Sequence, residues 1–310
     1  MDDKKLLLLY HAGSGKGKIK NNLSDIINLA VGQGYTVTVR PTQCKGDATE
    51  YVKLHGREYD RIICSGGDGT LVETVSGLFE AKLSCPIGYI PAGSTNDFAG
   101  SIGIPKNPLK AAQIALGDRI MQCDVGKFNG NLFTYVAAFG AFTDISYGTS
   151  QKYKNVFGHG AYVMEGIKTV GLGDFPAYEM TVHAGDRIIR DEFIYGMILN
   201  SYSIGGVKYL PMPDIKLDDG QFEVFLIKYP ESPGELNYIL TSLAAKEIDP
   251  DFFYYFKTNS LEIHSEKEVP WTLDGENGGC PNHVKIEIIK QALSIYIPEE
   301  KRRTHMNKQE

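Results

Sequence analysis

The chain has 310 residues, of which 42% are hydrophobic and 23% charged, and this composition suits one large or two medium-sized globular domains. Its net charge of −6 excludes the strongly basic surface that recruits nucleic acid. No apolar run approaches the ~20 residues of a membrane span, and the 5 cysteines form no CxxC pair, so we expect a cytoplasmic protein with reduced thiols.

The N-terminal part of the sequence alternates short apolar runs with helical spacing, which is typical of βαβ units. Strands are expected at residues 5–10, 35–40, 61–64 and 86–90, and helices at 22–32, 48–56, 71–80 and 108–116. This pattern predicts a parallel, Rossmann-like sheet with helices on its faces.

From Met121 onward the pattern changes to strand-like alternation. Strands are expected at 191–200, 221–228, 260–264 and 284–297, with helices at 162–170 and 233–246. Asn129-Gly130, Gly185-Asp186 and Asp219-Gly220 are typical of hairpin turns. We therefore expect a mostly antiparallel β-sandwich over 126–294, following an α/β domain of 1–125 to which the tail 295–310 returns.

A glycine-rich turn follows the strand expected at 61–64. Gly66, Gly67 and Gly69 surround Asp68, and helical spacing begins soon afterwards. Glycine lets backbone amides approach a ligand closely, and amides at a helix start bind anions. The turn therefore indicates phosphate binding, although such turns also serve as plain connections. A carboxylate beside phosphates further suggests a bridging Mg²⁺ or an attacking hydroxyl to orient.

A second small, polar turn, Gly93-Ser94-Thr95-Asn96-Asp97-Phe98, follows the strand expected at 86–90. Two neighbouring strand ends that deliver glycine, hydroxyl and carboxylate groups to one rim are typical of the ligand crevice of an open α/β sheet.

These two motifs in this order resemble the diacylglycerol kinase catalytic domain family, which is similar at longer range to sphingosine, NAD and 6-phosphofructo kinases. The resemblance implies an enzyme that binds ATP and Mg²⁺ on its α/β domain and presents a lipid acceptor on its β domain. ATP would lie in the cleft between the domains. The implied reaction phosphorylates a lipid hydroxyl, with diacylglycerol giving phosphatidic acid.

The resemblance also implies which residues contact the nucleotide. After the first strand the family has Asn-Pro-x-Ser-Gly, where this chain keeps the Ser-Gly pair but has His11 and Ala12 in place of Asn-Pro. The implied set is His11, Ala12, Gly13, Ser14, Gly15, Thr42, Gly66, Gly67, Asp68, Gly69, Thr70, Leu71, Val72, Glu73, Ser94, Asn96 and Asp97. Amides from Gly67 to Thr70 would hold the phosphates.

A structural Mg²⁺ is implied at a second place. The segment from Lys216 to Gln221 resembles the family's Asp-Gly turn, in which Asp219 would supply a carboxylate and Lys216 and Gln221 their carbonyls. Asp124, where the two expected domains meet, is a further candidate metal ligand, because the family often has an Asp there near its site. Without the resemblance, such an Asp would be interpreted as a helix cap or surface residue. Without the resemblance, the Asp-Gly pair would be interpreted as a plain hairpin turn.

The general base is sought in Leu273-Asp274-Gly275-Glu276, because in the family such a segment supplies the proton acceptor. The resemblance favours Glu276, with Asp274 and Asp68 as the other candidates. A carboxylate within reach of the acceptor hydroxyl is what this transfer needs.

Three alternatives stay open. An NAD kinase would share the first motif, but its second motif, Asn-x-Gly-x-Leu-Gly-Phe, is absent from this sequence. Another lipid, such as phosphatidylglycerol or a sphingoid base, could be the acceptor. A non-catalytic nucleotide-binding protein is favoured only by the His11-Ala12 substitution. We expect transient, peripheral contact with a membrane surface, no nucleic acid partner and a homodimer.

Overall fold

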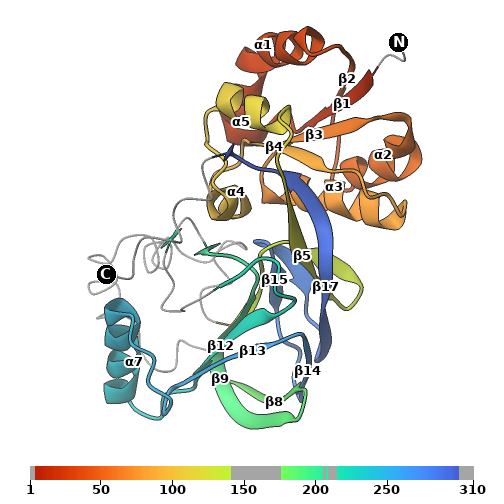
Figure 1. Cartoon of the computed structure of the whole chain (residues 1–310). Coiled ribbons are helices and arrows are strands. Elements are labelled where there is room, and N and C mark those ends of the chain that lie inside the picture. The colour runs from red at the N-terminus through yellow and green to blue at the C-terminus, as the bar shows by residue number, and fades with distance from the viewer. Residues whose placement is uncertain (1–3, 141–175, 205–206, 209–214, 300–310) are drawn as a thin grey trace. The chain divides into compact units, whose positions relative to one another are not determined.

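The computed structural model describes residues 4–140, 176–204, 207–208 and 215–299 (Figure 1). The chain divides into two compact units. One, called here the α/β unit, runs to Cys123 and includes the returning segment from Gln291, and the other, the β unit, is Asp124–Lys290. The helix expected at 162–170 lies outside the described residues. Among the residues described, no helix is both long and apolar enough to cross a membrane.

The α/β unit is built on a parallel sheet. Its strands are β1 (Lys4–Tyr10), β2 (Tyr35–Pro41), β3 (Arg61–Gly66), β4 (Ile87–Pro91) and the end of β17 (His283–Tyr296). Their order is β17-β4-β3-β1-β2, with Ile295 of β17 beside Ile87 of β4. The four leucines of β1 are at most 1% exposed, as expected for a parallel sheet covered on both faces. The parallel sheet predicted from the sequence is confirmed.

Helices cover both sides of this sheet. They are α1 (Lys18–Gly32), α2 (Asp47–His55), α3 (Asp68–Glu80), α4 (Asp97–Ile102) and α5 (Pro108–Ala115), with the short 3-10 turns η1 (Ser14–Gly17) and η2 (Gly56–Glu58). Helix α1 packs with α5, and α2 packs with α3, on opposite sides of the strands (Figure 1). Helix α3 begins three residues before the expected start, because the glycine-rich turn forms its first turn. Helix α4 was not expected.

Most of the described residues of the β unit lie in antiparallel strands. They are β5 (Ile120–Phe128), β6 (Asn131–Phe133), β7 (Val136–Gly140), β8 (Tyr178–Ala184), β9 (Arg187–Leu199), β10 (Ser203–Ile204), β11 (Val207–Lys208), β12 (Phe222–Lys228), β13 (Phe253–Thr258), β14 (Ser260–Ser265), β15 (Trp271–Leu273), β16 (Glu276–Gly279) and the first part of β17. One helix, α7 (Pro233–Ala245), begins after Ser232, whose side chain caps it as expected for this residue type.

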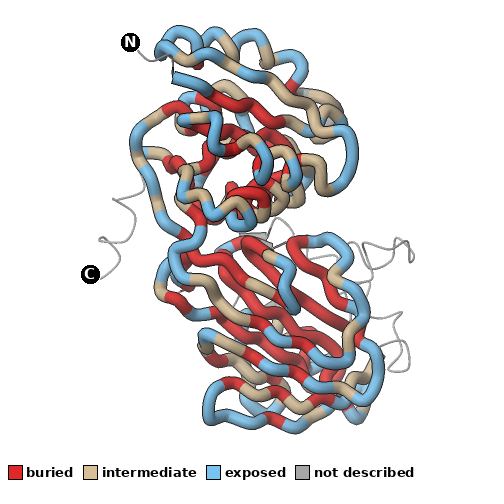
Figure 2. Tube along the Cα trace, turned by 90° about the vertical axis from the view of Figure 1, so that its right-hand side faces the viewer, coloured by how far each residue is buried: buried red, intermediate tan, exposed pale blue. Residues whose placement is uncertain are grey.

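The sheet of the β unit branches at β9. The first half of β9 pairs with β8, which continues through β14 to β17, whereas its second half pairs with both β7 and β12. Figure 2 shows long stretches of buried residues along these strands. In the core, the Trp271 ring lies 5.0 Å from the Phe128 ring and 4.8 Å from the Phe139 ring. The predicted antiparallel, strand-rich second domain is confirmed.

The three expected hairpin turns have different outcomes. Asn129 and Gly130, both at positive φ, connect β5 to β6, and Gly185 connects β8 to β9, as predicted. The Asp219-Gly220 pair is not a hairpin turn within the described residues, because it lies in a loop that leads into β12. The expectation was wrong here because a contact with a distant residue, described below, determines the turn.

Candidate functional site

Backbone hydrogen bonds connect the loops that follow the strands of the α/β unit. The Thr42 N–H donates to the Tyr10 carbonyl at 2.9 Å, and the His11 N–H donates to the Ser65 carbonyl at 2.9 Å. The loop after β4 is connected to the end of β3 in the same way, because the Ala92 N–H donates to the Gly66 carbonyl at 2.7 Å. The candidate nucleotide loops therefore meet at the carboxyl edge of the sheet, where open α/β folds bind ligands.

The two polar motifs approach each other at a pair of glycines. A Cβ added to Gly93 would lie 2.6 Å from the Gly67 Cα, closer than real Cβ contacts allow. Only a glycine at position 93 therefore allows the two loops to approach each other this closely. Both glycines are partly exposed, so the close approach leaves backbone rather than side chains at this part of the edge.

Asp68 connects the same two motifs through its carboxylate. Oδ2 accepts the Asp97 N–H at 3.1 Å, and Oδ1 accepts the Phe98 N–H at 3.4 Å. These are the first two amides of α4, where a negative charge is stabilising. Asp68 is 7% exposed, so its charge is held by helix amides at the rim of the sheet.

Asn96 shapes the second motif from inside it. Its side-chain oxygen accepts the Gly93 N–H at 2.7 Å, and its side-chain nitrogen donates to the Gly93 carbonyl at 2.8 Å. Asn96 has φ 54 and is 3% exposed. Asparagine tolerates this left-handed conformation better than most residues, so the side chain fixes the turn that carries Ser94, which is exposed.

Three residues of the implied nucleotide set have other partners. Leu71 is fully buried, and both its amide and that of Thr70 donate to the Gly67 carbonyl within α3. The Glu73 carboxylate accepts the Gly46 N–H at 2.8 Å and thereby fixes the loop after β2. The expectation that the Thr70 amide holds phosphates is corrected accordingly, whereas nucleotide contacts of Leu71 and Glu73 stay predictions. Gly67 and Gly69 remain partly exposed at the start of α3.

In the β unit, Asp124 contacts the Asp-Gly segment directly. The Asp124 carboxylate accepts the Gly220 N–H at 2.6 Å, and its own N–H donates to the Leu217 carbonyl at 2.7 Å. The Asn200 side chain donates to the Asp124 carbonyl at 2.7 Å. Asp124 is fully buried, so it organises the loop from within, while Lys216 and Gln221 are exposed beside it.

Asp219 lies at the rim of this loop with a lysine nearby. Its Oδ1 accepts the Gln221 N–H at 3.1 Å, and its Oδ2 lies 3.5 Å from the Lys257 Nζ. Lys257 also contacts the buried Glu223 at 2.9 Å, and burial raises the pKa of Glu223. The available oxygens are carboxylates and carbonyls, the ligands that Mg²⁺ prefers. The donor set therefore fits Mg²⁺ in kind, with Lys257 as a competing positive charge.

Both carboxylate oxygens of Asp274 accept hydrogen bonds, mostly from backbone N–H groups. Oδ2 accepts the N–H and the hydroxyl of Thr134 at 2.5 and 2.8 Å, and Oδ1 accepts the N–H groups of Tyr135 and Val136 at 2.9 and 3.0 Å. Burial raises the pKa of Asp274 to about 6, although these donors act in the opposite direction. Four donors leave no lone pair for a substrate hydroxyl, so the candidacy of Asp274 as general base is corrected to a structural role.

Glu276, the first residue of β16, is exposed, unlike Asp274 two residues before it. Asp274 and Gly275 both have positive φ, and this tight turn reverses the chain between β15 and β16. The buried Asp274 thus fixes the turn that carries the exposed Glu276 carboxylate.

The sequence did not reveal the partners that hold these groups. Thr134 and Asn200 carry no local signal, because each acts on a residue 76 or more positions away. The Tyr89 hydroxyl, which donates to the Gly66 carbonyl at 3.3 Å, was missed because its partner lies on a neighbouring strand 23 positions away. Only knowledge of which strands are neighbours could have identified these contacts.

Comparison with known proteins places the chain in a family. The sequence model described as "Diacylglycerol kinase catalytic domain" matches residues 5–128. A diacylglycerol kinase of Staphylococcus carnosus (strain TM300) is 30% identical over 311 residues, with 99% of each chain covered. A diacylglycerol kinase of Bacillus subtilis (strain 168) is 29% identical over 300 residues, covering 96% of this chain and 98% of that one.

Solved structures share the fold. A crystal structure from Bacillus anthracis str. Sterne has a TM-score of 0.79 and 25% identity, with 96% of both chains covered. A second, of a diacylglycerol kinase from the same strain, has a TM-score of 0.74 and 22% identity, covering 96% of this chain and 98% of that one. The chain therefore belongs to the diacylglycerol kinase catalytic domain family and is a lipid kinase.

Proposed function

We propose that the protein transfers the γ-phosphoryl group of ATP to the hydroxyl of a membrane lipid, with diacylglycerol as the acceptor and phosphatidic acid as the product. The relatives that cover nearly the whole chain carry the name diacylglycerol kinase, which supports this acceptor. The observation that carries the proposal is the close approach of Gly67 and Gly93 beside the start of α3. Bare backbone at a helix start is suited to phosphate groups.

The α/β unit would bind the nucleotide. Gly67 and Gly69 would offer their amides to the phosphates, and the exposed Ser94 would add a hydroxyl. His11 would lie beside the nucleotide with its ring against Gly13, whose added Cβ would be 3.2 Å from the His11 Nε2. Asp68, Asn96 and Glu73 would act indirectly, because their side chains hold the loops that carry these groups.

Glu276 is our candidate for the general base. Asp274 already accepts four hydrogen bonds, and both carboxylate oxygens of Asp68 accept amides of α4, so these two carboxylates are occupied in holding their loops. Glu276 is exposed, so its carboxylate can take a proton from the acceptor hydroxyl as the phosphoryl group is transferred. General-base assistance of this kind contributes typically 10²–10⁴-fold to a rate.

Mg²⁺ would enter the reaction with the nucleotide, where it would supply positive charge that offsets the phosphate oxygens. We further propose that a structural Mg²⁺ is held in the β unit by Asp219, with the carbonyls of Lys216 and Gln221 and with Asp124 organising the loop. The hydrogen bond between Asp124 and the Gly220 N–H supports this assignment because it fixes the turn beside Asp219.

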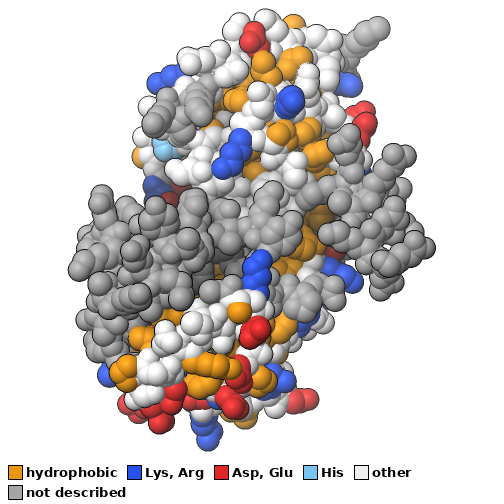
Figure 3. All heavy atoms as spheres, turned by 90° about the vertical axis from the view of Figure 1, so that its left-hand side faces the viewer, with side chains coloured by type: hydrophobic (Ala, Val, Ile, Leu, Met, Phe, Trp, Pro, Cys, Tyr) orange, Lys and Arg blue, Asp and Glu red, His pale blue; other side chains and the backbone are white. Residues whose placement is uncertain are grey.

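The acceptor lipid lies in a membrane, so the protein would visit the membrane surface transiently. On the face drawn in Figure 3, the described basic side chains are scattered among acidic and hydrophobic ones, which favours a weak and reversible contact. The expected homodimer stays a prediction, which light scattering of the purified protein would test.

Transfer of labelled γ-phosphate from ATP tests the function. The assay would offer diacylglycerol, phosphatidylglycerol and a sphingoid base in mixed micelles, and NAD in solution, each with Mg²⁺. We expect label on diacylglycerol, and a drop in kcat of roughly 100-fold or more for Glu276→Gln. Glu268→Gln is the matched control, because Glu268 is also an exposed glutamate of the β unit.

Label on another lipid would overturn the assignment of diacylglycerol while keeping the chemistry. Label on NAD would move the chain to the other branch of related kinases. Full activity of Glu276→Gln would exclude Glu276 as the base. Tight ATP binding without transfer to any acceptor would overturn the proposed reaction itself.

A further inference from the structure

Two histidines and a glutamate gather on the outer face of the β unit. Along β14, Leu261 and Ile263 are each 2% exposed, whereas Glu262 and His264 alternate with them and are exposed. His283, the first residue of β17, lies directly opposite His264 in the antiparallel register. The three side chains therefore share one face of a two-strand ladder, which the sequence spacing alone does not reveal.

The three groups converge on one carboxylate oxygen. Glu262 Oε1 lies 2.8 Å from the His283 Nε2 and 3.2 Å from the His264 Nε2. The two imidazole rings are stacked, with centroids 4.2 Å apart and an angle of 11° between their planes. Both rings therefore present the same nitrogen to the same oxygen, and one ligand atom from each residue lies within 4.8 Å of the others.

We propose that Glu262, His264 and His283 form a binding site for a divalent transition metal of the zinc type. Imidazole nitrogen and carboxylate oxygen are ordinary zinc ligands, at about 2.0–2.2 Å from the metal. The two Nε2 atoms and the Oε1 atom all lie within 4.8 Å of one another, so rotation of these exposed side chains would bring all three onto one ion. Each side chain is 48–54% exposed, so water would complete the coordination.

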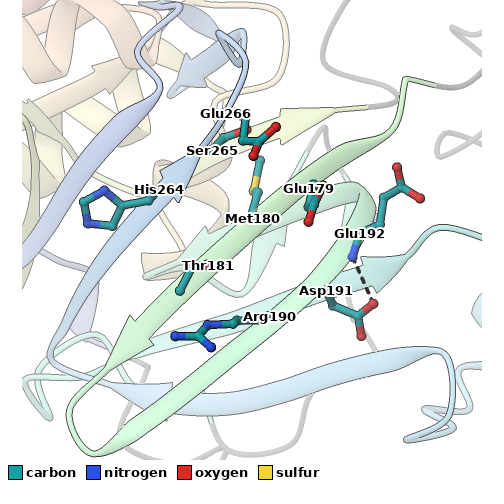
Figure 4. A pocket seen from close by; sticks show the side chains of 9 residues that line it. All are labelled: Glu179, Met180, Thr181, Arg190, Asp191, Glu192, His264, Ser265 and Glu266. Atoms are coloured by element: carbon teal, nitrogen blue, oxygen red, sulfur yellow. Dashed lines mark hydrogen bonds between the residues drawn. The ribbon is translucent and has the colours of Figure 1, made fainter.

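The ligand chemistry separates this site from the Asp219 loop. Two of its three ligands are nitrogens, which suit zinc, copper or nickel, whereas Mg²⁺ prefers oxygen ligands throughout. The nearby charges are mainly acidic: His264 borders a depression whose charged lining is Glu179, Asp191, Glu192 and Glu266 against one basic residue, Arg190 (Figure 4). Lys285, opposite Glu262 in the ladder, is paired with Glu287 at 2.8 Å.

The chain contains a natural comparison for this site. In the α/β unit, His55 Nδ1 lies 2.8 Å from Glu58 Oε1, and both are exposed. This pair has the same two ligand types, but among the described residues no third ligand accompanies it. If a histidine–glutamate contact alone were enough, both places would bind zinc equally well.

Isothermal titration of the full chain with Zn²⁺ tests the proposal. All proteins would carry Cys44→Ser and Cys280→Ser, because these exposed thiols could bind zinc themselves. We expect one site per chain, with an affinity that falls more than about tenfold in His283→Ala, where a direct ligand is lost. His55→Ala should leave the affinity unchanged. Mg²⁺ in large excess should not displace the zinc.

Thermal unfolding gives a second readout, because an ion that binds only the folded chain raises the Tm. The rise with Zn²⁺ should be present in His55→Ala and absent in His283→Ala. Glu262→Gln provides an independent variant should His283→Ala lose the circular dichroism of the folded protein. Equal zinc affinity in the parent and in the ligand variants, or saturation by Mg²⁺, would overturn the proposal.

Discussion

The carboxylate of Asp68, at the start of α3, accepts the backbone N–H of Asp97, the first residue of α4, at 3.1 Å. This contact joins two glycine-containing motifs that are 29 residues apart. The negative charge lies at a helix N-terminus, where it is stabilised. Asp68 therefore has a structural function within the rim of the sheet, whatever it contributes to the reaction.

Replacing Asp68 should separate its structural from its catalytic contribution. Asp68→Ala leaves two amides of α4 without an acceptor, and we expect a loss of about 1–3 kcal/mol in the free energy of unfolding, measured in urea. Asp68→Asn keeps one acceptor and should lose less. Asp25→Ala, at an exposed position of α1, is the control. If Asp68→Ala is as stable as the control, the capping role is wrong.

The glycine pair gives a sharper test of the nucleotide site. Gly93→Ala places a Cβ 2.6 Å from the Gly67 Cα, so the two loops must move apart. We expect a KM for ATP raised by tenfold or more, with a smaller effect on the KM for lipid. Gly32→Ala is the matched control, because its added Cβ meets nothing within 4 Å. Equal changes in both KM values would argue against a nucleotide site at this glycine pair.

Local sequence pattern was sufficient for most of the described helices and for about half of the strands, because apolar periodicity depends on neighbouring residues. The buried run of β1 and the alternation along β14 are examples. Helix α4 was missed because its first amides are held by Asp68, a contact made only in the folded chain.

The candidate site was predictable only where its residues form local motifs. The glycine turns were named from their motifs and Asp124 from the family resemblance, and the structure brings Asp124 to Gly220 across 96 positions. Asp274 and Glu276 look equivalent in sequence, yet one is saturated by donors about 140 residues away and the other is exposed. No local signal distinguishes two carboxylates whose environments are set by other strands.

The Asp219 loop predicts a stabilising effect of Mg²⁺. A metal bound only by the folded chain raises the Tm by mass action. We expect such a rise for the wild type, and its loss in Asp219→Asn, which weakens the one candidate ligand that is both charged and near the surface. Asp186→Asn, in the hairpin between β8 and β9, should retain the rise. No shift with Mg²⁺ in the wild type would contradict the structural metal site.

Asp274 predicts an unusual pH dependence of stability. Its pKa rises from 3.8 to about 6 in the folded chain, so between about pH 4 and pH 6 the folded state holds a proton that the unfolded state has lost. The raised pKa of Asp274 therefore adds up to about 3 kcal/mol to the free energy of unfolding below pH 4, and this contribution is lost as the pH rises to 6.

Thr134→Val tests this linkage without changing the carboxylate. The Thr134 hydroxyl donates to Asp274 at 2.8 Å and lowers its pKa. Its removal should cost about 1–3 kcal/mol at pH 7 and extend the falling limb of the stability profile above pH 6. Urea unfolding between pH 4 and 8 measures both effects. Thr241→Val, whose hydroxyl bonds within α7, should keep the wild-type profile. Parallel profiles for all three proteins would show that the hydroxyl does not control the Asp274 proton.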